Sequence, residues 1–116
     1  MADAARQIES NSHAQRRQTS RDLVDYDTII QRPGNIRRDV QLVDISPKGF
    51  HARCGSERFE RGETVSLRLP IIGLVQGRVM WSLRGCFGAQ FLMPIDARNY
   101  LDCLAELRQS TGKPRD

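Results

Sequence analysis

Two short polar segments carry the residues whose types and spacing could do chemistry. Residues 16–21 read RRQTSR, and residues 44–49 read DISPKG. Guanidinium groups bind phosphate oxygens in a forked geometry, while carboxylate and hydroxyl groups can complete the hydrogen bonding of a bound ligand. Taken singly, a basic hexapeptide is typical of a solvated linker and the second segment is typical of a turn. The candidate binding residues are Arg16, Arg17, Arg21, Asp44, Ser46 and Gly49.

Catalysis and metal binding have less support. Asp44, Ser46 and His51 are the residue types of a hydrolase triad, but types without geometry carry little weight, and a histidine on a strand surface is the commoner case. His51 and Cys54 lie three positions apart on a predicted strand, so they face opposite sides and cannot chelate together. The chain contains neither a GxxxxGK(S/T) nor a GxGxxG phosphate loop. We therefore expect no enzyme, no metal site and no cofactor.

Length and composition limit the class of protein. The chain has 116 residues, a formal net charge of +4 and a pI near 9.4, which fits one small domain with a mild preference for anionic partners. No apolar run approaches the roughly 18 residues of a membrane span, and no signal peptide is visible. Three cysteines without a CxxC pair favour a reducing cytoplasm. These features predict a cytoplasmic protein without a membrane contact.

Short strands must position the two polar segments. Apolar and polar residues alternate in residues 23–31, where Val24 and Ile30 share one face and Asp25 lies on the other. Pro47, together with a Gly49 that tolerates positive φ, predicts a tight turn after the second strand. Many short strands separated by turn signals indicate a small antiparallel barrel or sandwich. The predicted strands span residues 23–31, 36–45, 50–54, 64–69, 74–83 and 86–92, with a polar connection at 55–63.

The two ends of the chain differ from this pattern. Residues 1–15 are too polar to offset the cost of ordering and predict a mobile arm, and residues 110–116 predict a flexible tail. Asp96 is a suitable N-cap for a helix over 96–109 that packs on a barrel mouth. Its apolar residues at helical spacing are Tyr100, Leu101, Leu104 and Leu107. We expect the cysteines to be small core residues, and we expect core positions, rather than exposed partner anchors, for Trp81, Phe87 and Phe91.

Together the two polar segments resemble the signature of the PilZ domain family. Arg17 and Arg21 match its RxxxR motif, and Asp44, Ser46 and Gly49 match the (D/N)xSxxG motif that follows. The resemblance covers residues 16–107. It implies an all-β fold, a six-stranded antiparallel β-barrel with a C-terminal α-helix, over a domain at 16–109. Within that domain it implies a ligand-binding linker at 16–22, a barrel at 23–93 and the helix at 96–109.

The resemblance implies binding of cyclic di-GMP, a bacterial second messenger, and the residue chemistry suits this ligand. Arginine forks onto phosphate oxygens and the O6/N7 edge of guanine, and it stacks on purine faces. Asp44 can accept from the guanine N1–H and N2–H₂ groups, and Ser46 can both donate and accept. Gly49 would let the turn close and leave room for the ligand. An arginine at position 16, directly before RxxxR, implies that two stacked ligand molecules bind per chain.

A receptor of this kind needs an output. We expect the ligand to order the 1–22 arm over the barrel and so change the surface presented to an unidentified downstream protein. Two alternatives stay open. One is a PilZ-like adaptor that binds partners without a ligand. The other is a small barrel that binds single-stranded nucleic acid, which the 6% aromatic content disfavours because such barrels stack bases on exposed aromatic residues.

Overall fold

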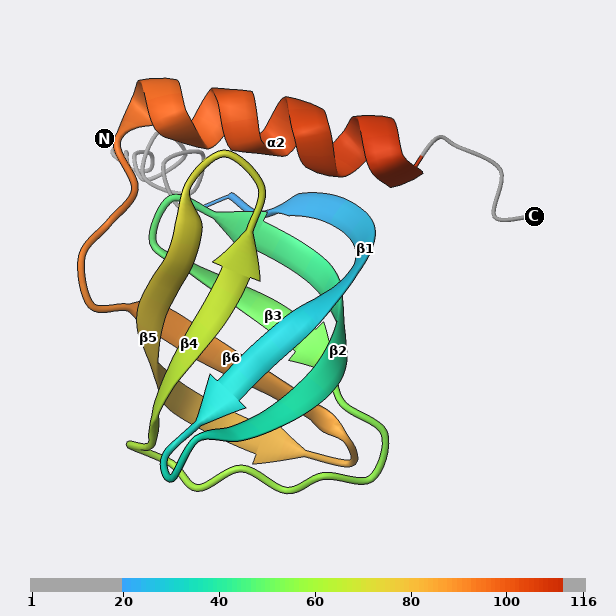
Figure 1. The fold of residues 1–116 in the computed structure, drawn as a ribbon, viewed down its shortest axis with the longest axis vertical. Coiled ribbons are helices and arrows are strands. Elements are labelled where there is room, and N and C mark those ends of the chain that lie inside the picture. Colours follow the sequence, from blue (N-terminus) through green and yellow to red (C-terminus); the bar gives the residue numbers. More distant parts are fainter. Residues whose placement is uncertain (1–19, 112–116) are drawn as a thin grey trace, which may run out of the picture.

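The computed structural model describes residues 20–111, which form six strands followed by one helix (Figure 1). The predicted fold class, a six-stranded antiparallel barrel with a C-terminal helix, is confirmed. Each strand boundary lies within one residue of its predicted position. The elements are β1 (Asp22–Arg32), β2 (Ile36–Ser46), β3 (Gly49–Arg53), β4 (Thr64–Leu69), β5 (Gly73–Leu83), β6 (Cys86–Phe91) and α2 (Ala97–Thr111).

The strands close into a barrel in the order β1-β2-β3-β6-β5-β4, and β4 returns to pair with β1. Tight turns join the neighbours β1–β2, β2–β3 and β5–β6, which brings both ends of the second polar segment onto adjacent strands. In the turn at 33–35, Gly34 and Asn35 have φ values of 82° and 62°, a left-handed conformation that glycine and asparagine adopt more readily than other residues. Closure leaves no strand edge open in this sheet, and it curves the outer face on which the polar segments lie.

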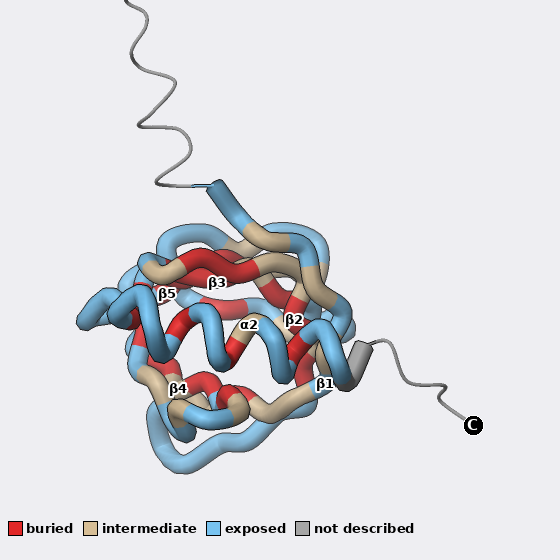
Figure 2. Tube along the Cα trace, turned by 90° about the horizontal axis from the view of Figure 1, so that it is seen from above, coloured by how far each residue is buried: buried red, intermediate tan, exposed pale blue. Residues whose placement is uncertain are grey.

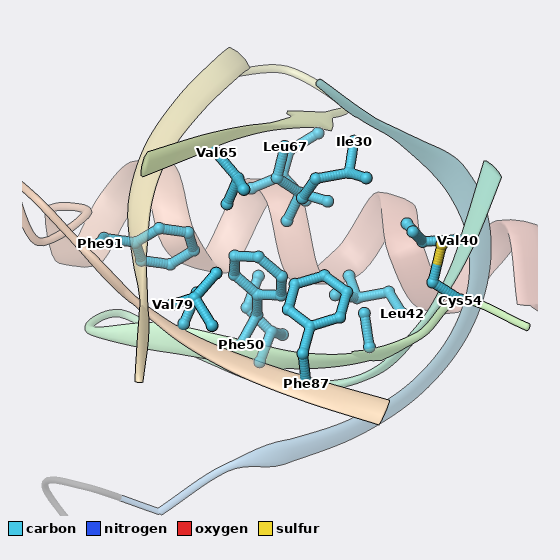
Figure 3. Close-up of a cluster of buried hydrophobic side chains, with 14 of the residues drawn as sticks. Ile30, Val40, Leu42, Phe50, Cys54, Val65, Leu67, Val79, Phe87 and Phe91 are labelled. Atoms are coloured by element: carbon cyan, nitrogen blue, oxygen red, sulfur yellow. The ribbon is translucent and has the colours of Figure 1, made fainter. Parts of the chain in front are cut away.

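Apolar side chains from all six strands fill the barrel (Figure 3). Phe50 lies at the centre, with its ring edge-on to Phe87 at 5.7 Å between centroids and 5.6 Å from Phe91. The predicted core positions of Phe87 and Phe91 are thus confirmed. Of the cysteines, Cys54 and Cys103 are buried as expected, and burial raises the pKa of the Cys103 thiol to about 11, so it stays protonated at neutral pH.

The connection between β3 and β4 contributes a residue to the core, which its polar composition did not predict. Phe59 turns into the barrel, is 4% exposed and stacks on Phe87 at 4.0 Å between ring centroids. The Arg32 guanidinium lies 4.3 Å from the Phe59 centroid and binds Glu63 through two hydrogen bonds of 2.7 and 2.9 Å. Although burial of Glu63 opposes ionisation, the hydrogen bonds from Arg32 hold the pKa of its carboxyl below the usual value. This connection therefore closes the barrel end opposite the helix.

Helix α2 lies across the other end of the barrel (Figures 1 and 2). Asp96 caps it as predicted, because its Oδ1 accepts a 2.8 Å hydrogen bond from the backbone N–H of Asn99. The buried face consists of Tyr100, Cys103 and Leu107, whereas Leu101, which was predicted to share that face, is 62% exposed. The helix continues to Thr111, past the predicted end at 109, because no helix-breaking residue precedes Gly112.

Tyr100 joins the helix to two strands. Its hydroxyl hydrogen-bonds the Asp22 carboxylate and lies 3.0 Å from the backbone carbonyl of Ile45. We expect Tyr100→Phe to lower the free energy of unfolding by about 1–2 kcal/mol, since it removes a hydrogen bond to a charged group. Urea denaturation measures this change. Leu101→Ala, on the exposed face of the same helix, should stay within about 0.5 kcal/mol of wild type, and an equal loss in both variants would contradict the assignment.

Several sequence predictions fall on residues that the structure does not describe. The arm at 1–15, Arg16, Arg17 and the tail at 112–116 lie outside the described residues. Within 20–111, no helix is long and apolar enough to cross a membrane.

Candidate functional site

The fold brings the end of the first polar segment onto the second. Arg21, directly before β1, places its Nη1 3.0 Å from Oδ1 of Asp44 near the end of β2. The side chain of Asp44 is 13% exposed and that of Arg21 is 46% exposed. Because β1 and β2 are antiparallel and Leu23 pairs with Asp44, the start of one strand must lie beside the end of the other. The two motifs therefore meet at one place on the barrel.

A row of residues crosses the outer face of the barrel from Asp44. In the register of the sheet, Asp44 pairs with His51 on β3, His51 pairs with Gly88 on β6, and Gly88 pairs with Trp81 on β5. His51 Nδ1 lies 3.2 Å from Asp44 Oδ2, so the carboxylate is held from both sides. Gly88 has no side chain between the two rings, and the His51 and Trp81 centroids approach to 5.2 Å. A Cβ on Gly88 would overlap the indole of Trp81.

The next row contains the other two residues of the second motif. Ser46 pairs with Gly49, and Gly49 pairs with Gln90 on β6. The Ser46 side chain is buried, and its Oγ accepts a 3.1 Å hydrogen bond from the backbone N–H of Lys48. This contact shapes the turn and leaves the hydroxyl hydrogen available as a donor.

Gly49 is needed for a reason other than the predicted one. The φ angle of Gly49 is not positive, so the turn does not require the conformational freedom of glycine at this position. A Cβ at this position would instead collide with the backbone carbonyl oxygen of Ala89 on β6. Glycine here permits a close approach of β3 and β6 and keeps the surface beside Ser46 low.

A hollow of about 250 Å³ lies over these rows. Its lining includes two glycines, an aromatic ring, a methionine and two cationic side chains. Asp44 does not line it but bonds to Arg21, which does. The lining residues are Arg21, Ser46, Lys48, Gly49, Met80, Trp81, Gly88, Ala89 and Gln90.

Trp81 is a site residue that the sequence reasoning placed wrongly. It was predicted to be core because it shares the parity of Val79, yet it is 41% exposed while Val79 is fully buried. A register shift between Val79 and Trp81 in the β5–β6 pairing reverses the face of the following residues. The alternation of the sequence carries no signal that would have revealed this bulge.

Asp44, Ser46 and His51 do not form the hydrogen-bonded chain of a hydrolase triad. Asp44 and His51 form a pair, but among the described residues His51 Nε2 has no hydrogen-bond partner, and Ser46 Oγ bonds to the turn backbone instead. Within the described chain, no group of three or more His, Cys, Asp or Glu side chains could hold a metal ion.

The chain is thus a small closed antiparallel barrel that carries an arginine–aspartate pair beside an open hollow. The family model of the PilZ domain matches residues 15–109. Because this match covers most of the chain, the protein belongs to the PilZ domain family, whose members are ligand-binding receptor domains for cyclic di-GMP. None of the curated proteins matches the chain.

Proposed function

We propose that this protein is a bacterial, cytoplasmic receptor that binds cyclic di-GMP through Arg17 and Arg21 of RxxxR and through Asp44, Ser46 and Gly49 of DxSxxG. The observation that carries the proposal is the 3.0 Å ion pair between Arg21 and Asp44 at the edge of the hollow. It joins the two motifs across 23 positions of sequence. This contact supports the proposal because it brings one residue of the first motif beside one residue of the second.

The chemistry of this surface suits a nucleotide with two phosphates and two guanines. Arg21 and Lys48 supply positive charge at the hollow, and a guanidinium can also fork onto the O6/N7 edge of guanine. The indole of Trp81 packs over Gly88, and its exposed part offers a flat apolar face on which a purine could stack. Asp44 can accept from the N1–H and N2–H₂ edge once Arg21 turns toward a phosphate.

The output of the receptor is the second part of the proposal. Residues 1–22 would become ordered over the barrel when Arg17 and Arg21 bind the ligand, which changes the shape and charge that a downstream protein meets. Arg16 would stack on a second guanine, so that two ligand molecules bind per chain.

Isothermal titration with cyclic di-GMP tests the binding proposal. We expect saturable binding with a molar ratio nearer two than one, and little response to GMP, GTP or linear pGpG. Trp81 is the sole tryptophan of the sequence, so its fluorescence reports independently on the hollow and should change with the same midpoint. A folded protein that shows neither heat nor a fluorescence change would overturn the receptor proposal and favour a ligand-independent adaptor.

A salt series separates the remaining alternative. Binding of single-stranded nucleic acid would fall steeply as salt rises and would tolerate changes of base sequence. Binding of a clamped cyclic dinucleotide should depend on the guanines, so an oligonucleotide that competes fully with cyclic di-GMP at low salt would favour the nucleic-acid barrel.

A further inference from the structure

His51 is the polar residue of this surface that neither motif includes. It extends from β3 between Asp44 and Trp81, with its side chain 26% exposed. Its two ring nitrogens have different surroundings. Nδ1 lies 3.2 Å from Asp44 Oδ2, while Nε2 is shielded from solvent and has no hydrogen-bond partner among the described residues.

These surroundings select one tautomer of the neutral ring. With the proton on Nδ1, the ring donates to the carboxylate and leaves a bare lone pair in the shielded position. With the proton on Nε2, a shielded N–H would lack an acceptor, and the Nδ1 lone pair would face a carboxylate oxygen. The second arrangement costs more free energy, because the Nε2–H donor has no acceptor and the Nδ1 lone pair is repelled by the carboxylate oxygen.

On the basis of the proposed function, we propose that His51 is a positioning residue of the nucleotide site. Its Nδ1–H holds Oδ2 of Asp44, so that Oδ1 stays directed toward Arg21, which lines the hollow. The same ring packs against Trp81, with 5.2 Å between the two ring centroids and a 58° tilt, and so steadies the second wall of the site. His51 thus connects Asp44, which would hydrogen-bond to a guanine, with Trp81, on which a guanine ring would stack.

Two substitutions separate these contacts. His51→Phe keeps a ring against Trp81 but removes the donor to Asp44, and His51→Asn places an amide N–H near the former Nδ1 position but removes the ring. We expect His51→Phe to weaken cyclic di-GMP binding about tenfold, as loss of a hydrogen bond to a charged group implies. His51→Asn should restore most of that loss. The reverse order, with His51→Phe near wild type and His51→Asn weak, would show that the ring only packs and would overturn the proposal.

A double-mutant cycle tests whether His51 acts through Asp44. In an Asp44→Ala background, His51→Phe should cause no further loss of affinity, because the group that it positions is gone. Full additivity of the two losses would contradict the proposal. His51→Phe combined with Arg37→Ala, which removes an exposed arginine at the start of β2, is the control pair and should be additive, because Asp44 lies near the other end of that strand.

A measurement on the ligand-free protein keeps this inference separate from the proposed function. Long-range ¹H–¹⁵N spectra of the imidazole should show a protonated Nδ1 and a bare Nε2 in wild type, and Asp44→Ala should shift the population toward the Nε2–H tautomer. A wild-type ring that already carries its proton on Nε2 overturns the positioning role whether or not the nucleotide binds. If the ring shows the expected tautomer but the protein does not bind cyclic di-GMP, the contact between His51 and Asp44 is supported and the proposed ligand is refuted.

Discussion

Replacement of Arg21 by alanine should weaken cyclic di-GMP binding by about 100-fold or more while leaving the fold intact. The expected loss corresponds to two charge-assisted hydrogen bonds from one guanidinium, each worth about 1.5 kcal/mol or more. Stability should change by less than about 1 kcal/mol, because the Arg21 side chain is 46% exposed and exposed ion pairs contribute little to folding. Titration calorimetry measures the first effect and urea denaturation the second.

Two control variants sharpen this experiment. Arg21→Lys keeps the charge but lacks the fork, so we expect an affinity between those of wild type and the alanine variant. Arg37→Ala removes an exposed arginine near the start of β2, away from Asp44 at the other end of that strand, and matches the change in net charge. If Arg37→Ala weakened binding as much as Arg21→Ala, attraction by net charge alone would explain the affinity, and the proposed clamp would be wrong.

The strands could be predicted because alternation is a local signal. In β1 the exposed and partly buried residues alternate as Val24, Asp25 and Tyr26 do in the sequence, and the predicted bounds of every strand were nearly correct. The failures lie where burial is decided by distant pairing. Phe59 belongs to a connection without periodicity, and only the stacking with Phe87 shows that it is a core residue.

One part of the candidate site could be predicted from the sequence, and another part could not. Arg21 and Asp44 were chosen from a family signature, and their ion pair depends on the antiparallel register of β1 and β2. The row from His51 across Gly88 to Trp81 is formed by three strands whose order, β3-β6-β5, is not sequential. A single sequence does not state which strands are neighbours, so the aromatic wall of the hollow could not be inferred from spacing.

Gly49→Ala should be the most destabilising single-methyl addition at this site. The added Cβ would overlap the carbonyl oxygen of Ala89, which is backbone and cannot rotate away, so β3 and β6 must separate. We expect a loss of about 3 kcal/mol, a large share of the roughly 5–15 kcal/mol that holds a small domain together. Because Ser46 pairs with Gly49, the same movement should also weaken nucleotide binding. Urea denaturation, followed by titration under native conditions, measures both effects.

Gly77→Ala is the matched comparison, since Gly77 faces the neighbouring carbonyl of the same strand β6. There a Cβ would lie 3.2 Å from the oxygen of Gln90, so a shift of a few tenths of an ångström relieves the contact. Alanine also reduces the conformational freedom of the unfolded chain, which offsets part of that cost, and we expect a net change within about 1 kcal/mol. Similar stabilities of the two variants would mean that β3 and β6 part without cost. In that case glycine at position 49 would serve the ligand rather than the packing of the barrel, and the binding defect of Gly49→Ala would appear without any loss of stability.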